Sequence, residues 1–176
     1  MDITKFNTQY SGDYARPNLF QVTIAGTAPA MDVEMFVKTA TLPNTTVGVV
    51  EVPYQNRKLK VPGDRTFADW TATIMNDESY VVREALLEWQ MKITGFTKFS
   101  SAIDVSEAHR AITIQPFDRG GNNSTHKVLV YGWPSEIGTI DLSWETPDAI
   151  QEYTVTFSVS WDDGGIDGAD VAVLGN

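Results

Sequence analysis

Apolar and polar residues alternate repeatedly along this chain of 176 residues. Residues 153–161 are the clearest case, with threonines and serines between Tyr153, Val155, Phe157, Val159 and Trp161. Successive side chains of a β-strand point to opposite faces, so a period of two indicates a strand with one buried face. The same pattern predicts further strands at residues 20–24, 68–74, 111–117 and 127–133. Residues 31–40 would also suit a helix, but we favour a strand because they lead into an extended segment before Pro43.

Residues 45–66 predict a long protruding hairpin, because two β-rich arms flank a polar tip at residues 54–56. On the return arm Lys58 and Lys60 alternate with Leu59 and Val61, so one face is charged and the other apolar. An apolar hairpin face without a local partner favours aggregation unless something covers it. Two interpretations follow: the hairpin lies on its own domain with lysines guarding its edge, or it docks on another subunit.

One amphipathic helix is predicted at residues 79–94. Its apolar stripe runs through Val82, Leu86, Trp89 and Ile93 at spacings of four, three and four, and Gly95 ends it. Residues 76–79 supply candidates for the N-cap and acids for the first turn. About seven short strands and this helix predict a mainly β fold, an antiparallel sandwich or barrel with one flanking helix. We expect a single domain over residues 1–161, with 1–18 as an N-terminal arm and 162–176 as an acidic, glycine-rich tail.

Charge divides the chain into an acidic body and a basic projection. The net charge is −10, yet residues 53–66 carry Arg57, Lys58, Lys60 and Arg65 against Asp64 alone. That segment sums to +3 and the remainder to −13. An acidic body with a basic projection can attract copies of itself, whereas the overall charge argues against tight binding of nucleic acid.

Residues with catalytic or metal-binding potential are sparse. The chain has no cysteine, and His109 and His126 stand in no metal-ligand spacing. The aspartates of residues 162–170 match no ordered calcium loop, and residues 62–65 do not form a phosphate loop. We therefore expect no catalytic residue, no cofactor and no metal. The N-terminus lacks an apolar signal region and no apolar run approaches about 20 residues, which predicts an intracellular product that engages no membrane.

Two long blocks of the sequence resemble one known family. Residues 53–70 resemble the hairpin-plus-strand block of T4-like bacteriophage tail tube proteins, and residues 140–144 with 148–157 are similar to that family's C-terminal block. The first block reads Pro53-Tyr54, then Arg57-Lys58-Leu59-Lys60-Val61-Pro62-Gly63-Asp64-Arg65-Thr66-Phe67-Ala68-Asp69-Trp70. The likeness spans roughly residues 16–161, and residues 97–123 add nothing specific to it.

This resemblance implies a structural subunit of a contractile phage tail tube. Subunits would close into homo-hexameric rings that stack inside a sheath, with the baseplate and tail terminator as further partners and genomic DNA passing through the lumen without specific binding. The implied location is the virion tail, after assembly in the host cytoplasm. The hairpin would dock on the neighbouring ring. We assign that docking to Val47, Val49, Val50, Tyr54, Arg57, Lys58, Lys60 and Arg65.

Three alternatives remain open. The first is a tube subunit of a type VI secretion or extracellular contractile injection system, since related folds form those tubes. A different class is a monomeric β-sandwich module, in which Tyr54 and Trp133 would stack on a carbohydrate. A hydrolase is a more distant alternative, because the sequence indicates no pair of base and nucleophile.

Overall fold

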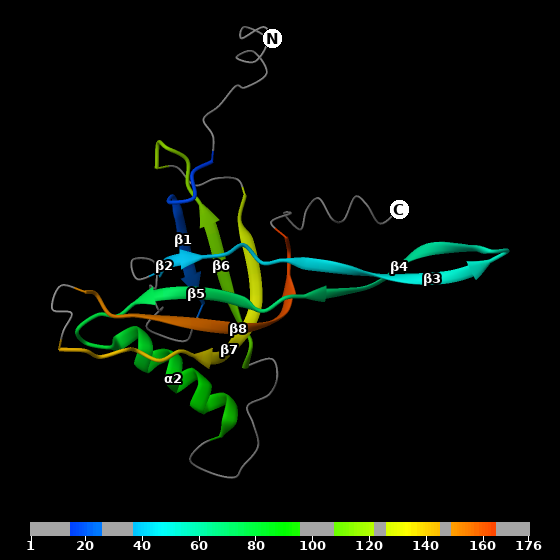
Figure 1. Ribbon diagram of the computed structural model, residues 1–176. Coiled ribbons are helices and arrows are strands. Elements are labelled where there is room, and N and C mark those ends of the chain that lie inside the picture. The colour runs from blue at the N-terminus through cyan, green and yellow to red at the C-terminus, as the bar shows by residue number, and fades with distance from the viewer. Residues whose placement is uncertain (1–14, 26–36, 96–107, 122–125, 145–148, 165–176) are drawn as a thin grey trace, which may run out of the picture.

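The computed structural model describes residues 15–25, 37–95, 108–121, 126–144 and 149–164 (Figure 1). In these ranges, all strand pairs are antiparallel and fall into two sheets, a six-stranded one in the order β1-β6-β7-β8-β5-β2 and a two-stranded one made by β3 and β4. The strands are β1 (Phe20–Ile24), β2 (Val37–Ala40), β3 (Thr45–Tyr54), β4 (Arg57–Phe67), β5 (Trp70–Met75), β6 (Arg110–Pro116), β7 (Val128–Ile137) and β8 (Glu152–Asp162).

The six-stranded sheet curls into a nearly closed barrel, with the helix α2 (Val81–Thr94) beneath it and the β3–β4 hairpin projecting to one side (Figure 1). The two edge strands, β1 and β2, approach each other across a cavity of about 360 Å³ that both help to line, through Phe20 and Ala40. The predicted mainly β fold with a flanking helix and a protruding hairpin is confirmed. The predicted arm up to residue 14, the first part of the strand predicted at 31–40 and the tail from residue 165 lie outside the described residues.

Three aromatic side chains form the centre of the core. The ring of Phe157 on β8 lies 5.2 Å from that of Trp70 on β5 and 6.2 Å from that of Trp89 on α2. Aliphatic side chains from the six sheet strands surround them, because the inward positions of each strand are apolar, as the alternation predicted.

The alternation of β8 breaks at its end. Tyr153, Val155, Phe157 and Val159 point inward as predicted, but Trp161 is 46% exposed and Asp162 is buried. The pairing with β7 shifts register there, because Tyr131 pairs with Trp161 while Gly132 pairs with Val159. The extra residue turns the following side chains over, as a β-bulge does. The strand therefore ends one residue later than predicted, and Asp162 belongs to the barrel rather than to the tail.

The strand β7 also runs past its predicted end at Trp133, to Ile137. Pro134 interrupts the pattern without ending the strand, because it lies beside a second register shift, at Pro134/Glu136. The side-chain amide of Gln90 on α2 donates to the carbonyl oxygen of Ser135 at 3.1 Å. The helix thereby satisfies backbone that the irregular strand leaves unpaired.

The helix α2 begins two residues later than predicted and does not use the predicted caps. Its N-cap is Tyr80 in a left-handed conformation, with φ of 55°, and no side chain caps the first turn. Asn76 instead donates its side-chain amide to Oε1 of Gln151, at 3.0 Å, so it binds the residue just before β8. The predicted end is confirmed, because Gly95 adopts φ of 65° and donates its N–H to the carbonyl oxygen of Met91.

The buried face of α2 is the predicted one. Val82, Leu86 and Trp89 are buried, and Ile93 packs against the core from its rim. The guanidinium of Arg83 donates to the carbonyl oxygen of Gly138 after β7, and the indole N–H of Trp89 donates to the carbonyl oxygen of Ala108. These bonds fasten the helix to the barrel along its length.

We expect the wild-type protein to lose folding stability at high pH and the variant Tyr153→Phe to be spared this loss. Burial raises the pKa of Tyr153 to about 12 from its ordinary value of 10, and its hydroxyl makes no hydrogen bond with the described residues. Because the folded state holds this proton more tightly, the associated stability is complete below pH 10 and is lost as the pH rises towards 12. The loss is about 1.4 kcal/mol per pH unit in that window. Guanidinium unfolding of both proteins between pH 8 and 11.5 measures it, and parallel pH profiles would contradict the prediction.

Candidate subunit docking surface

The β3–β4 hairpin stands clear of the barrel and is exposed along almost its whole length (Figure 1). Its tip is a two-residue turn, in which Gln55 and Asn56 have φ of 42° and 62°. Positive φ at both positions defines the turn type that matches the twist of paired strands. An isolated two-stranded hairpin is only marginally stable in water, so this one needs a partner that the described part of the chain does not supply.

The pairing register sorts the hairpin's side chains into two faces. Val50 pairs with Val61 and Val52 with Leu59, and directly paired residues share a face. We call these four side chains the aliphatic face; they are between 40% and 61% exposed. Tyr54 and Arg57, which pair at the tip, continue the same side. An exposed cluster of this kind marks an interaction surface.

The opposite side carries Glu51, Lys58 and Lys60. Glu51 pairs with Lys60 across the strands and forms an ion pair of 2.6 Å with Nζ of Lys58. Because Glu51 lies on the outgoing strand, the whole hairpin over residues 45–67 carries a net charge of +2, against +3 for residues 53–66 alone. Val49, Pro53 and Pro62 complete this side, which we call the charged face.

A bulge separates the projecting part of the hairpin from its base. The register shifts between Val47 and Val49, where the backbones of Gly48 and Gly63 approach closely. A Cβ built on Gly63 would lie 3.2 Å from the backbone of Gly48, so a larger residue would push the strands apart.

The base is tied to the barrel. Nη2 of Arg65 lies 3.8 Å from Oδ1 of Asp162, which is 1% exposed at the end of β8, and the Arg65 guanidinium stacks over the Phe67 ring. This ion pair connects the base of the hairpin to the end of β8. Arg65 is therefore engaged within its own chain and is less available for a contact with another subunit.

The predicted docking residues thus fall into three places. Val50, Tyr54 and Arg57 lie on the side of the aliphatic face, whereas Val49, Lys58 and Lys60 lie on the charged face, and Val47 and Arg65 pair at the base. The prediction omitted Val52, Leu59 and Val61 on the aliphatic face and Glu51 on the charged one. The alternation of residues 50–54 and 57–61 was the signal that would have found them.

The structure does bring one histidine and one serine together. Nε2 of His109 lies 2.7 Å from Oγ of Ser160, and the imidazole packs edge-on against Trp133 at 4.7 Å. The sequence indicated no such pair, because His109 precedes β6 and Ser160 lies in β8, far away along the chain. The contact joins the start of β6 to β8. Trp133 is half-buried and already contacts His109, which leaves less of its ring for stacking on a ligand.

Within the described ranges, no group of three or more histidine, cysteine or acidic residues is placed to hold a metal ion. The same residues include no helix long and apolar enough to cross a membrane. The most distinctive surface in this part of the chain is the two-faced hairpin.

A nearly closed β-barrel with a long exposed hairpin is the architecture expected of a structural subunit, because such a hairpin offers a surface for other subunits to cover. The family described as "Phage tail tube protein" matches residues 4–161, and the chain belongs to that family. It is 34% identical over 152 residues to "Tail tube protein gp19" of Enterobacteria phage T4, covering 86% of this chain and 92% of that protein. "Tail tube protein gp19" of Enterobacteria phage T6 gives the same identity and coverage.

Solved structures share the fold at low sequence identity. A chain from an extracellular contractile injection system, "PVC sheath-tube complex in extended state", aligns with a TM-score of 0.62 and 12% identity, covering 92% of this chain and 96% of that one. A chain from the "anti-feeding prophage cap (AFP tube terminating cap)" aligns with a TM-score of 0.65 and 14% identity, covering 87% and 91%. The family resemblance predicted from the two sequence blocks is confirmed.

Proposed function

We propose that this chain is a non-enzymatic tube subunit of a contractile phage tail that closes into six-fold rings, and that the rings stack through the hairpin. The observation that carries the proposal is the exposure of both hairpin faces. Stacking is a head-to-tail contact, which needs two different complementary surfaces and extends into a filament. A basic hairpin and an acidic body provide such surfaces.

The comparisons and the structure support the phage assignment over the first two of the three alternatives. The relatives at 34% identity are phage tail tube proteins, whereas the injection-system chains share the fold at 14% identity or less. A monomeric carbohydrate module would need Trp133 free, and its ring packs against His109. On this proposal the subunit resides in the virion tail, after assembly in the host cytoplasm.

The same proposal names the partners. Sheath, baseplate and terminator proteins would contact the tube, since chains with this fold come from a baseplate, a sheath/tube terminator and a sheath-tube complex. The genomic DNA would pass through the lumen without a specific site, because an acidic protein offers phosphates few cations to bind. No cofactor enters this function.

Reversing three hairpin cations tests the docking role. We expect the triple variant Arg57→Glu, Lys58→Glu, Lys60→Glu to remain folded and to form no tubes, because its hairpin would be repelled by an acidic neighbour. Negative-stain electron microscopy of the purified protein measures this, together with its melting temperature. Six-fold rings in wild-type images would support the ring, and a wild-type protein that stays monomeric at all concentrations would contradict it.

The matched control reverses three exposed cations outside the hairpin, Lys38, Lys92 and Lys127. This second variant carries the same net charge as the first, and we expect it to assemble. Normal tubes from the hairpin variant, or equal loss of tubes from both variants, would count against docking by the hairpin.

A further inference from the structure

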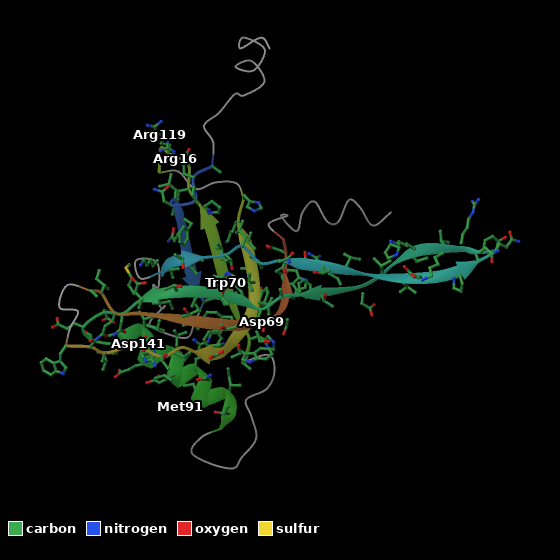
Figure 2. The ribbon with its side chains drawn as sticks, viewed as in Figure 1. Arg16, Asp69, Trp70, Met91, Arg119 and Asp141 are labelled. Atoms are coloured by element: carbon green, nitrogen blue, oxygen red, sulfur yellow. The ribbon has the colours of Figure 1, made fainter. Side chains whose placement is uncertain are left out.

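A second exposed apolar surface lies at the end of the molecule remote from the hairpin. The segment between β7 and β8 exposes Leu142 at 75%, Ile150 at 67% and Trp144 completely. Together with Asp141, Ser143, Ala149 and Gln151 these residues line a pocket of about 480 Å³. Figure 2 labels Asp141 at the opposite side of the barrel from the hairpin. Exposed tryptophan beside aliphatic side chains is typical of the residues that carry binding energy in protein interfaces.

One wall of this pocket is held in place by the subunit itself. Oε1 of Gln151 accepts hydrogen bonds from the amide of Asn76 and the hydroxyl of Tyr80, both at 3.0 Å. The backbone carbonyl of Gln151 accepts a further bond from the N–H of Asn76, at 2.8 Å. Because these bonds exist before any partner arrives, a docking segment meets a preformed wall.

Charge points to the hairpin as the occupant. Residues 138–151, which link β7 to β8, contain three acidic residues and no lysine or arginine, so the segment that forms this pocket is acidic. Asp141 lies in the pocket lining itself. The hairpin is the basic part of the chain, at +2, and it carries an aliphatic face that matches an apolar pocket. The cavity between β1 and β2 fits less well, because its lining includes Arg16 and no acid.

We propose that the pocket around Leu142, Trp144 and Ile150 receives the aliphatic face of the hairpin from a second copy of this chain. The inference rests on the proposed function and names the acceptor for its docking step. Val52 and Leu59 enter the apolar pocket, and Arg57 at the tip approaches Asp141 in its lining. A chain cannot fill its own pocket, because the two surfaces lie at opposite ends (Figure 2). The contact is therefore heterologous and propagates from copy to copy.

Engineered cysteines test this contact directly, because the chain contains no cysteine of its own. In the double variant Val52→Cys, Leu142→Cys, mild oxidation of assembled tubes is expected to give a ladder of disulfide-linked multimers on a non-reducing gel. A mixture of the two single variants gives dimers only. The matched control is Val49→Cys, Leu142→Cys, which places the thiol on the charged face of the same strand. We expect no ladder from that control.

The outcomes separate the inference from the proposed function. Tubes without a ladder from Val52→Cys, Leu142→Cys, or equal ladders from both double variants, would overturn the assigned contact while the tube itself stands. Wild-type protein that forms no tubes would overturn both. A second measurement uses Trp144→Ala, which we expect to raise the critical concentration for tube formation at least tenfold, with Trp144→Phe restoring most of it. Unchanged assembly of Trp144→Ala would also overturn the inference.

Discussion

Replacing Trp70 by alanine is expected to lower the free energy of unfolding of the subunit by about 3–5 kcal/mol. The indole is 1% exposed at the centre of the barrel and lies 5.2 Å from the ring of Phe157. Its N–H also donates to the carbonyl oxygen of Thr41, which holds the segment after β2 against the barrel. Domains of this size are stable by roughly 5–15 kcal/mol, so the substitution removes a large share. Chemical unfolding followed by far-ultraviolet circular dichroism measures the loss.

The chain offers a matched control in Trp144, because the same side chain is there fully exposed. Trp144→Ala should change the free energy of unfolding by no more than about 0.5 kcal/mol, as surface substitutions usually do. A similar loss in the two variants would show that the barrel does not depend on burial of Trp70. The pair also separates stability from assembly, since Trp144→Ala is expected to affect only tube formation.

The sequence was sufficient to predict the mainly β fold, because its strands are half buried, but it did not decide between a sandwich and a barrel. Alternation in residues 153–159 and 70–74 reflects one inward and one outward face, and the structure confirms both. Prediction failed where the backbone departs from that period. The bulge before Trp161 turns that ring outward, and the strand β7 continues through Pro134 because a second irregularity accommodates it. Neither register shift can be recognised from the order of apolar residues in the sequence.

The start of the helix was misplaced for a different reason. Asn76 is a good N-cap by type, but Gln151 competes for its amide, and that residue is distant in sequence. Tyr80 takes the cap position in a left-handed conformation that a tyrosine seldom adopts. A tertiary contact thus outweighed a local preference.

The position of the docking surface could be predicted from the sequence, but only some of its residues could. The hairpin and its cations follow from residues 45–66, yet the sorting of side chains into faces needs the register across the strands. Glu51 neutralises part of the positive charge of Lys58 and Lys60. The pocket around Trp144 could not be found from sequence, since a tryptophan is ordinarily expected inside.

Substituting threonine for Val52 and Leu59 together is expected to abolish tube formation at concentrations where the wild type assembles. Both side chains lie on the aliphatic face and are exposed in the subunit, so the monomer should keep its melting temperature. Full burial of such a side chain contributes about 1.5–3 kcal/mol. Removing two such side chains from a repeated contact should raise the critical concentration by tenfold or more. Each 1.4 kcal/mol of binding free energy that is lost weakens the binding constant by a factor of about ten. Sedimentation of tubes across a concentration series measures it.

Salt then separates the roles of the two faces. Attraction between the basic hairpin and an acidic neighbour acts over about 10 Å at 0.1 M salt and is screened above that concentration, so wild-type tubes should form more slowly as salt rises. The aliphatic contact is not screened, and therefore tubes already formed should persist. Val49→Thr on the charged face is the matched control and should assemble normally. If the double threonine variant assembles like the wild type at low salt, the charges rather than the aliphatic face hold the subunits together.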